Sequence, residues 1–472
     1  MNLCRHYIGF LVVSFLLSGC LALSTLEEGR PPLSQDGEMV LFLQPLPPEA
    51  AGLKFTIAEL SVLHHDGSRT PVPLLFYEID AAALQGAQKK LASMVLPPGL
   101  YDGIVMRLAR SPGTAAEVDT SLPVSDEPME VGHLFDILPG KALALFFSIE
   151  LPEENRRGTR FAPRFTLTPA AHGPINMNGY IANARTNTIT VFNKKKLQVV
   201  DVIATDREPV DLVVDPDRAR AYAAVAGDNL VAAIDLFKRE VIEKLRLSLN
   251  DRPAALALTP DGRTMVAVNN GSNTVSIIDA LAMVEIDRIS VGEGPTQVVI
   301  TPSGLKAVVL NTRDSTVSVI DLPQKVLAVT IGLEGEPTHA STDRDGSRLY
   351  VVSHNSPNLA VIDLTSLKVT GKVFIGAQGA CIATDPQTGL LYIGLEGPNE
   401  IVVVDPFALA PIDIFHLESR PAFLTIESQE RHLFVTLPDQ GELKRIEIIS
   451  KRISTAIDVG KGANAVAFAN ER

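Results

Sequence analysis

The residues whose types and spacing could do chemistry are Gln297, His339 and Cys381, which follow one another at intervals of 42 positions. Imidazole and thiolate groups are the ligands that soft metal ions prefer, so His339 and Cys381 are the candidate metal ligands of this sequence. Two protein ligands are too few to define a closed metal site. The interpretation that we favour is a solvated histidine and a small cysteine that fills a wall of the fold. We therefore expect no cofactor and no catalytic residue.

The sequence patterns of common enzyme classes are absent. The chain contains no H-E-x-x-H, G-x-S-x-G, Walker or dinucleotide-binding pattern, and no C-x-x-C-H haem attachment site. It has no tryptophan, which disfavours a quinone-stacking site or an aromatic platform for sugars. The formal net charge of −13 at pH 7 is unlike that of a nucleic-acid-binding protein. We expect no nucleic-acid partner.

The first twenty residues have the features of an export signal. Arg5 precedes an apolar run, Ile8 to Leu17, that is too short to cross a bilayer as a helix. The run ends in Leu-Ser-Gly-Cys, which resembles the lipobox of bacterial lipoproteins. The resemblance implies a signal peptide over residues 1–19, cleavage before Cys20 and acylation of that cysteine, with palmitate among the possible acyl groups. An ordinary signal peptide with an incidental cysteine is the alternative.

The expected mature chain begins with a polar, proline-containing stretch over residues 20–36, which is typical of a tether. Leu21 follows the cysteine, and in a Gram-negative host this residue favours sorting to the outer membrane. The sequence thus predicts a lipid-anchored protein of the bacterial cell envelope, facing the periplasm or the outside.

The interval of 42 positions belongs to a repeat that runs through the rest of the chain. A strand-ending pair, usually Ile-Asp, recurs seven times with spacings of 42 or 44 residues. A second marker, usually proline, runs in step with it and takes its insertion at the same place: Pro209, Pro253, Pro295, Pro337, Gly379, Pro421 and Ala463. A period in the low forties is typical of the four-stranded blades of a β-propeller.

The strands of each blade can be predicted from alternation and turn residues. Between Pro253 and Val291, four short runs rich in β-branched residues are separated by turns that contain Pro, Gly or Asn. The first unit lacks its first strand, and the chain ends, from Lys461 to Arg472, in a first strand alone. We expect this terminal strand to complete the first blade and close a seven-bladed ring over residues 175–472, which leaves no sheet edge open at the seam.

The sequences of the repeats resemble those of a known family. Tyr180 to Asn183 reads YIAN, and SNTVSIID and PDGR recur in related forms. These stretches resemble the YVTN-repeat seven-bladed propellers of bacterial and archaeal envelopes. The resemblance covers residues 175–472 and implies the fold; it says little about function, because members share the scaffold and differ in what they do.

Residues 37–170 lack the repeat and alternate in short apolar runs, which predicts a β-sandwich. The stretch Leu96 to Leu108 resembles a strand entry of transthyretin-like domains, in which Gly99 allows the turn and Tyr101 starts the next strand. One short helix is expected within residues 81–94. The fold class is therefore all-β, a sandwich followed by a propeller.

Two surfaces of the propeller could carry function. First strands line the central channel of a propeller, so the residues two positions after each marker, His339 and Cys381 among them, are expected to face it. The rim formed by the loops before the markers and between second and third strands is polar. Its candidate binding residues are Arg252, Asn273, Arg313, Glu336, His354, Asn358 and Arg420. The basic run at residues 193–197 is interpreted as a solvated turn.

Three functions were weighed against these observations. The favoured one is a non-enzymatic binding or scaffold module, monomeric, whose rim contacts an envelope protein or polymer. The alternative is a propeller enzyme, a lactonase-like hydrolase or a metal-dependent redox protein, that uses the central channel. A DNA-binding role is disfavoured by the acidic charge.

Overall fold

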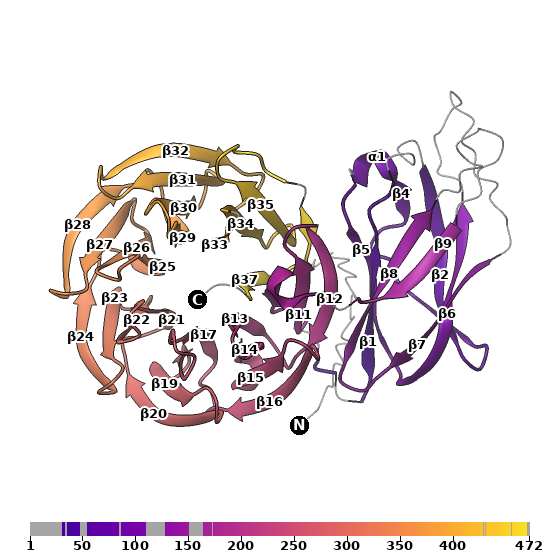
Figure 1. The fold of residues 1–472 in the computed structure, drawn as a ribbon, viewed down its shortest axis with the longest axis horizontal. Helices are drawn as coiled ribbons and strands as arrows, with labels where there is room; N and C mark the ends of the chain where they lie inside the picture. Colours follow the sequence, from indigo (N-terminus) through magenta and orange to yellow (C-terminus); the bar gives the residue numbers. More distant parts are fainter. Residues whose placement is uncertain are drawn as a thin grey trace, which may run out of the picture.

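The structure of the chain is a computed structural model, and it confirms an all-β fold in which a β-sandwich precedes a seven-bladed propeller (Figure 1). The residues that it describes are 31–33, 35–47, 54–84, 86–109, 128–150, 164–171, 173–427, 429, 431–454 and 456–469. The expected signal peptide and Cys20 lie outside these residues. Within the described part of the chain, no helix is long and apolar enough to cross a membrane.

The sandwich consists of two sheets that enclose a separate hydrophobic core. One sheet has the order β5-β1-β8-β9, formed by Lys89–Leu96, Gly37–Leu43, Ala142–Glu150 and Arg164–Pro169. The other has the order β3-β2-β6-β7, formed by Arg69–Pro71, Lys54–His64, Gly99–Ala109 and Met129–Ile137, with β4 (Glu78–Asp80) also paired to β2. The side chains between the sheets include Phe55, Tyr101 and Phe147, all fully buried, so this domain has a core of its own.

One helix prediction in the sandwich is wrong in extent. The helix α1 spans only Ala81–Leu84, and Lys89–Leu96 forms strand β5 instead. Gly86 has a φ of 71°, which interrupts a helix after its first turn. The residues beyond it pair antiparallel with β1, so tertiary pairing overrides their helical propensity.

The propeller strands follow the repeat. The first blade contains β10 (Asn178–Asn183), β11 (Thr188–Asn193) and β12 (Gln198–Ala204). The next three blades are β13 to β16 (Pro209–Asp215, Arg220–Val225, Leu230–Asp235, Glu240–Arg246), β17 to β20 (Pro253–Leu258, Thr264–Asn269, Thr274–Asp279, Val284–Ser290) and β21 to β24 (Pro295–Ile300, Lys306–Asn311, Thr316–Asp321, Val326–Gly332). The last three are β25 to β28 (Glu336–Thr342, Arg348–His354, Asn358–Asp363, Lys368–Phe374), β29 to β32 (Gly379–Thr384, Leu391–Leu395, Glu400–Asp405, Ala410–His416) and β33 to β36 (Phe423–Glu427, His432–Leu437, Glu442–Glu447, Ile457–Asp458).

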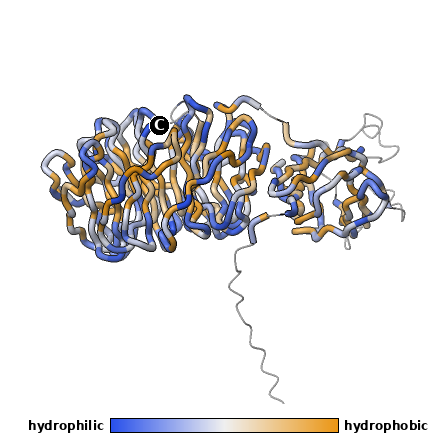
Figure 2. The backbone as a smooth tube through the Cα atoms, turned by 90° about the horizontal axis from the view of Figure 1, so that it is seen from below, coloured by the Kyte–Doolittle hydropathy of each residue, from blue (hydrophilic) through white to orange (hydrophobic). Residues whose placement is uncertain are grey.

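The ring closes through strand exchange between the ends of the repeat. The last strand, β37 (Ala463–Phe468), pairs antiparallel with β10 and supplies the innermost strand of the first blade. A short 3₁₀ turn, Ile175–Met177, leads into β10 from the sandwich. Figure 2 shows apolar residues along the strands through the middle of the ring and hydrophilic residues toward its two rims. The two rims are therefore the polar faces on which the loops gather.

The recurring aspartate at the end of each third strand shapes a turn. The Asp279 side chain accepts hydrogen bonds from the N–H groups of Leu281 and Ala282, both at 2.9 Å. Met283, which ends the turn, has a φ of 50°. Asx turns of this kind explain why the Ile-Asp pair returns in most blades, since the carboxylate fixes the connection to the fourth strand.

The sandwich lies directly against the first blade. Figure 1 places β1 and β8 beside β12, the outer strand of that blade. Phe42 and Phe146 of the sandwich share one hydrophobic cluster with Phe192 and Val199 of the propeller. Gln88 adds two hydrogen bonds, because its amide donates to the Val199 carbonyl at 3.0 Å and accepts from the Val199 N–H at 2.6 Å. The sandwich thus covers the outer edge of the first blade, which is also the blade that contains the closing strand.

Candidate functional site

The central channel contains a cavity of about 510 Å³. The first strands of six blades and β37 line it, as expected for a propeller. Most lining groups are aliphatic or small, such as Leu256, Ala340 and Val466, while Gln297 and His339 are polar. The channel combines apolar side chains with neutral polar ones, among them Ser341 and Thr384.

Two of the residues that lie two positions after the markers connect neighbouring blades. A β-bulge lies between marker and residue, for example between Pro209 and Asp211, and re-aims the side chain. Asp211 accepts a hydrogen bond from the Leu256 N–H of the next blade at 2.8 Å. Gln297 does the same with the Ala340 N–H at 2.7 Å. These polar side chains therefore fasten one blade to the next.

Cys381 does not face the channel, which corrects the sequence-based expectation. Its side chain is fully buried among the residues of the sixth and seventh blades. A Cβ atom added to Gly394 would lie 2.5 Å from the Cys381 Sγ and 2.9 Å from Pro421, so the sulfur fills a closely packed space. Burial raises the pKa of the thiol, which keeps it protonated at neutral pH and unsuited to metal binding or nucleophilic attack.

His339 is the candidate that remains at the channel. It lines the cavity, and its ring meets the Phe423 ring edge-on at a centroid distance of 6.2 Å. Burial lowers its pKa to about 4, so the imidazole is neutral at physiological pH. Across the ring, burial raises the pKa of Asp211 to about 7, although two backbone N–H groups donate to the carboxylate. Within the described residues, no three His, Cys, Asp or Glu side chains form a group that could hold a metal.

The polar rim carries ion pairs that cross between blades. Glu396 of the sixth blade faces two neighbours: His354 Nδ1 lies 3.3 Å from its Oε2, and Arg420 Nη1 lies 3.2 Å from its Oε1. Arg252 Nη2 lies 2.9 Å from the Glu208 Oε2. Three of the candidate binding residues, His354, Arg420 and Arg252, are thus already engaged with a partner on the rim.

Two further candidates support loop structure. Asn273 adopts a φ of 55°, and its side chain accepts a hydrogen bond from the Gly294 N–H at 2.9 Å. Asn187 and Asn229 make the corresponding bonds in the first two blades. Asn358 donates its N–H to the Ser356 hydroxyl at 3.2 Å. Asn273 therefore holds one loop to another, and its side-chain oxygen is occupied.

Arg313 and Glu336 differ from the other candidates because both side chains are exposed and no ion pair joins either to another described residue. They come from adjacent blades: Arg313 lies in the loop after β22, and Glu336 is the first residue of β25. The Thr312 hydroxyl donates to the Pro337 carbonyl at 2.8 Å, which ties the loop of Arg313 to the start of β25. Arg313 also packs its side chain against Gly294, where a Cβ would come within 2.5 Å. The two residues thus present exposed charges of opposite sign on neighbouring blades.

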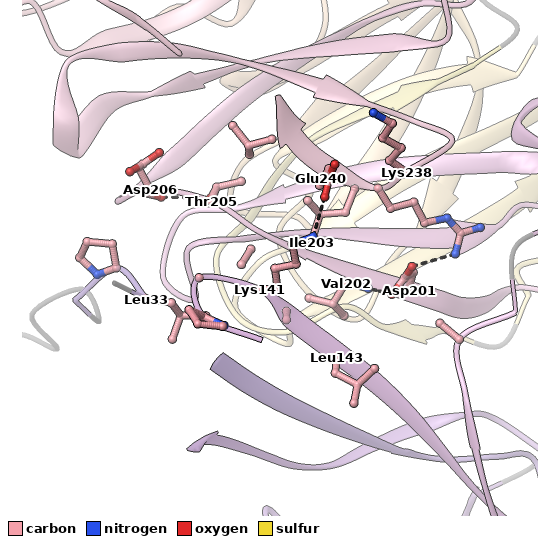
Figure 3. Close-up of a pocket in the computed structure, with 18 of the residues that line it drawn as sticks. Leu33, Lys141, Leu143, Asp201, Val202, Ile203, Thr205, Asp206, Lys238 and Glu240 are labelled. Atoms are coloured by element: carbon pink, nitrogen blue, oxygen red, sulfur yellow. Dashed lines mark hydrogen bonds and ion pairs between the residues drawn. The ribbon is translucent and has the colours of Figure 1, made fainter. Parts of the chain in front are cut away.

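A second cavity, of about 370 Å³, lies between the sandwich and the first two blades (Figure 3). Six of its charged groups form ion pairs: Lys141 contacts Glu240 at 2.6 Å, Arg239 contacts Asp201 at 2.9 Å, and Lys244 contacts Asp206 at 2.7 Å. These pairs fasten the domains and the blades together. Sequence reasoning missed this cavity, because its walls come from segments that only the docked domains bring together.

Sequence reasoning also misplaced one lysine. The sequence predicts a solvated turn at residues 193–197, but Lys194 is buried and its Nζ lies 2.6 Å from the Glu427 Oε1. Lys195 and Lys196 are exposed, as expected. Glu427 lies in the seventh blade, 233 positions away, so no local signal could have revealed the pair.

Comparison with known proteins supports the propeller. Residues 174–389 match a family described as YNCE-like beta-propeller. Three solved structures are similar in fold. Hydrazine synthase of Kuenenia stuttgartiensis has a TM-score of 0.53 at 18% identity, covering 59% of this chain and 94% of that one. A functionally unknown protein from Desulfotomaculum acetoxidans DSM 771 has a TM-score of 0.56 at 16% identity, covering 62% and 98%.

The third structure is the dihydro-heme d1 dehydrogenase NirN in complex with DHE, with a TM-score of 0.50 at 14% identity, covering 63% of this chain and 76% of that one. No curated protein matches the sequence. At these identities the likeness extends to the fold alone, because propellers carry many unrelated functions.

Proposed function

We propose that this chain is a bacterial envelope lipoprotein that acts as a non-enzymatic binding module. In this proposal Cys20 carries the lipid anchor, placed in the outer membrane, and the polar rim of the propeller contacts an envelope protein or polymer. The sandwich supports the role of a fixed mount, since it packs against the first blade through a shared hydrophobic cluster. We also propose that the sandwich is transthyretin-like, on the strand entry at Gly99 and Tyr101 alone; the Tyr101 hydroxyl donates to the Pro97 carbonyl at 2.7 Å there.

The observation that carries the proposal is the pair Arg313 and Glu336. Charges mounted on a fixed backbone spare a partner the cost of ordering that backbone, which favours recognition. The two charges have opposite signs, so the surface suits a partner that presents mixed charge and disfavours a simple polyanion. Most other charged rim residues are already paired within the protein.

The test is capture of partners from envelope extracts of the source organism by chemical crosslinking, followed by mass spectrometry. The variant Arg313→Glu should lower the recovery of the specific partner about tenfold, because it reverses a charge at the contact. Glu336→Arg should act in the same direction. The matched control is Arg263→Glu, an exposed arginine in a turn of the opposite rim. Equal recovery of the partner with Arg313→Glu and Arg263→Glu would contradict the proposal that this rim contacts the partner.

The lipid anchor has its own test. Cells that express the full chain are fed an alkyne analogue of palmitate, and the purified protein is examined for label and for the mass of its N-terminal peptide. We expect label on the wild type and none on Cys20→Ser, with Cys381→Ser labelled like the wild type. An unlabelled wild type that is nevertheless exported would show an ordinary signal peptide.

A further inference from the structure

The described side chains that line the cavity of the central channel form an apolar side and a polar side. The strands β37, β13 and β17 line one side with aliphatic, aromatic or small residues, and the hydroxyl of Thr259, which follows β17, binds Asp261 of its own turn at 2.6 Å. The strands β21, β25, β29 and β33 line the other side, and their polar residues there are Gln297, His339, Ser341, Thr384 and Thr425. Figure 1 shows all these strands around the centre of the ring.

The cavity has no charged wall. None of the described side chains that line it belongs to Asp, Glu, Lys or Arg, and His339 is neutral because burial lowers its pKa to about 4. Asp211 lies in β13, but its two carboxylate oxygens accept the N–H groups of Leu212 and Leu256 between the blades. An ion that entered the cavity would lose hydration without meeting an opposite charge. The cavity therefore favours uncharged ligands.

The amide of Gln297 presents a hydrogen-bond donor on the polar side. Its Oε1 accepts the Ala340 N–H at 2.7 Å, and this bond fixes the orientation of the amide, since the reverse orientation would set two donors against each other. The Nε2 group is therefore the other end of the amide. The side chain is half-buried and lines the cavity, and no described residue accepts a hydrogen bond from Nε2. An N–H group in this setting suits a carbonyl oxygen.

Hydroxyl groups add further donors on the same side. The Thr384 hydroxyl donates to the Ser341 hydroxyl at 2.8 Å, so the Ser341 oxygen is the acceptor and its own hydrogen is left for a group in the cavity. Thr425 adds a hydroxyl to which no described residue binds. The Nδ1 of His339 is buried and does not reach the cavity. The polar side thus offers mainly donors, which suits a ligand that supplies an acceptor.

We propose that the channel binds an uncharged carbonyl compound with an apolar chain, of the kind found in fatty acyl esters. The carbonyl oxygen accepts from the Gln297 amide and the Ser341 hydroxyl, which lie close together because Gln297 is bonded to Ala340, and the chain lies against β37, β13 and β17. The cavity volume of about 510 Å³ is in the usual range for small-molecule sites. This site is independent of the proposed rim contact, since it uses the inner strands rather than the rim.

The experiment is a fluorescence titration with Nile red, an uncharged dye that has a ring carbonyl and emits strongly in apolar surroundings. The protein is the chain from Leu21 to Arg472, which retains every described residue. We expect saturable, equimolar binding that methyl octanoate displaces. Octanoate has the same acyl chain but carries a charge, so it should compete at least about tenfold less well. Equal competition by the two compounds would contradict an uncharged ligand.

One variant tests the donor. Gln297→Glu keeps an oxygen for the Ala340 N–H and replaces the Nε2 donor with a second oxygen, so the affinity for Nile red at pH 8 should fall about tenfold or more. The matched control is Gln324→Glu, at an exposed glutamine of the same blade, which should bind like the wild type. If both variants bind like the wild type, the Gln297 amide does not hold the carbonyl and the proposal is wrong.

A second variant locates the dye. Ala257→Phe narrows the channel on its apolar side and should abolish saturable binding, whereas Ala282→Phe, in an exposed turn of the same blade, should leave it unchanged. Circular dichroism and thermal unfolding check that each variant is folded. A wild type without saturable binding overturns the proposal. Equal binding by Ala257→Phe and Ala282→Phe overturns it as well, because the dye then lies on the exposed apolar surface of the protein.

Discussion

At the scale of single residues, burial decides the protonation of His339. The imidazole lies against Phe423, and its Nδ1 has no hydrogen-bond partner among the described residues. Loss of solvation lowers the pKa to about 4, whereas a histidine in the unfolded chain titrates near 6.5. The unfolded state therefore binds more protons between these two values, and stability depends on pH in that window.

We expect His339 to contribute stability that is complete above about pH 6.5 and is lost as the pH falls toward 4. The variant His339→Phe has no titrating ring, so the wild type should lose about 1–3 kcal/mol more than the variant between pH 7 and pH 4.5. Urea unfolding of both proteins at the two pH values measures the difference. Parallel pH profiles would mean that His339 is solvated in the folded protein.

The free thiol is a second case in which packing outweighs chemistry. Cys381 has the residue type of a ligand or nucleophile, but its sulfur fills the space between Gly394 and Pro421. A raised thiol pKa and complete burial leave it unreactive. It acts here as a small apolar side chain, which is the usual role of a buried cysteine.

At the scale of elements, the loops between second and third strands contain residues with a left-handed backbone. The side chains of some of these residues bind the neighbouring loop. Asn273, with a φ of 55°, accepts the Gly294 N–H, and the equivalent position of the next blade is Ser315, also at 55°. Asparagine tolerates this conformation better than most residues do. The polar rim is therefore built before any partner binds.

Substitution of Asn273 should show how much its side-chain hydrogen bond contributes to the stability of the protein. Asn273→Ala loses one hydrogen bond and a favourable left-handed residue, which should lower the free energy of unfolding by about 1–2 kcal/mol. Ser315→Ala, at the matched position, should change it by less than about 0.5 kcal/mol. Denaturant titration gives both values. If the two substitutions cost the same, the side-chain bond of Asn273 contributes nothing to the loop.

At the scale of the whole molecule, the seam of the ring is reinforced by a buried ion pair. Lys194 is 6% exposed and Glu427 is 2% exposed, with 2.6 Å between their charged atoms, and the lysine also lies 5.9 Å from the centre of the Phe468 ring. Phe468 belongs to β37, the strand that closes the ring. The pair thus joins the first blade, the seventh blade and the closing strand at one point.

Removal of one partner should take this ion pair away from a charged group that stays buried. Lys194→Met should lower the free energy of unfolding by about 3–5 kcal/mol, and a second change, Glu427→Leu, should restore a large part of the loss. Lys195→Met, an exposed neighbour in the same turn, is the control and should have little effect. Thermal and denaturant unfolding report these differences. A double variant whose free energy of unfolding is as low as that of Lys194→Met would show that packing, rather than charge, matters at the seam.

The sequence by itself determined the architecture, because the signals for it are local. The spacing of the Ile-Asp pairs reflects an Asx turn within each blade, and alternation within five or six residues defines each strand. A solitary first strand at the C-terminus implied a partner at the start of the repeat, and β37 pairs with β10. Four candidate rim residues could likewise be placed on loops, whereas Glu336, His354 and Asn358 lie at strand ends.

Only the tertiary structure decided what these residues touch. Gln297 and His339 line the channel whereas Cys381 is buried beside Gly394, since a β-bulge and the neighbouring blade determine each side chain's surroundings. Lys194 meets an acid 233 positions away, and Gln88 meets Val199 across the domain boundary. Such contacts depend on the packing of distant segments, and no periodicity or local composition encodes them.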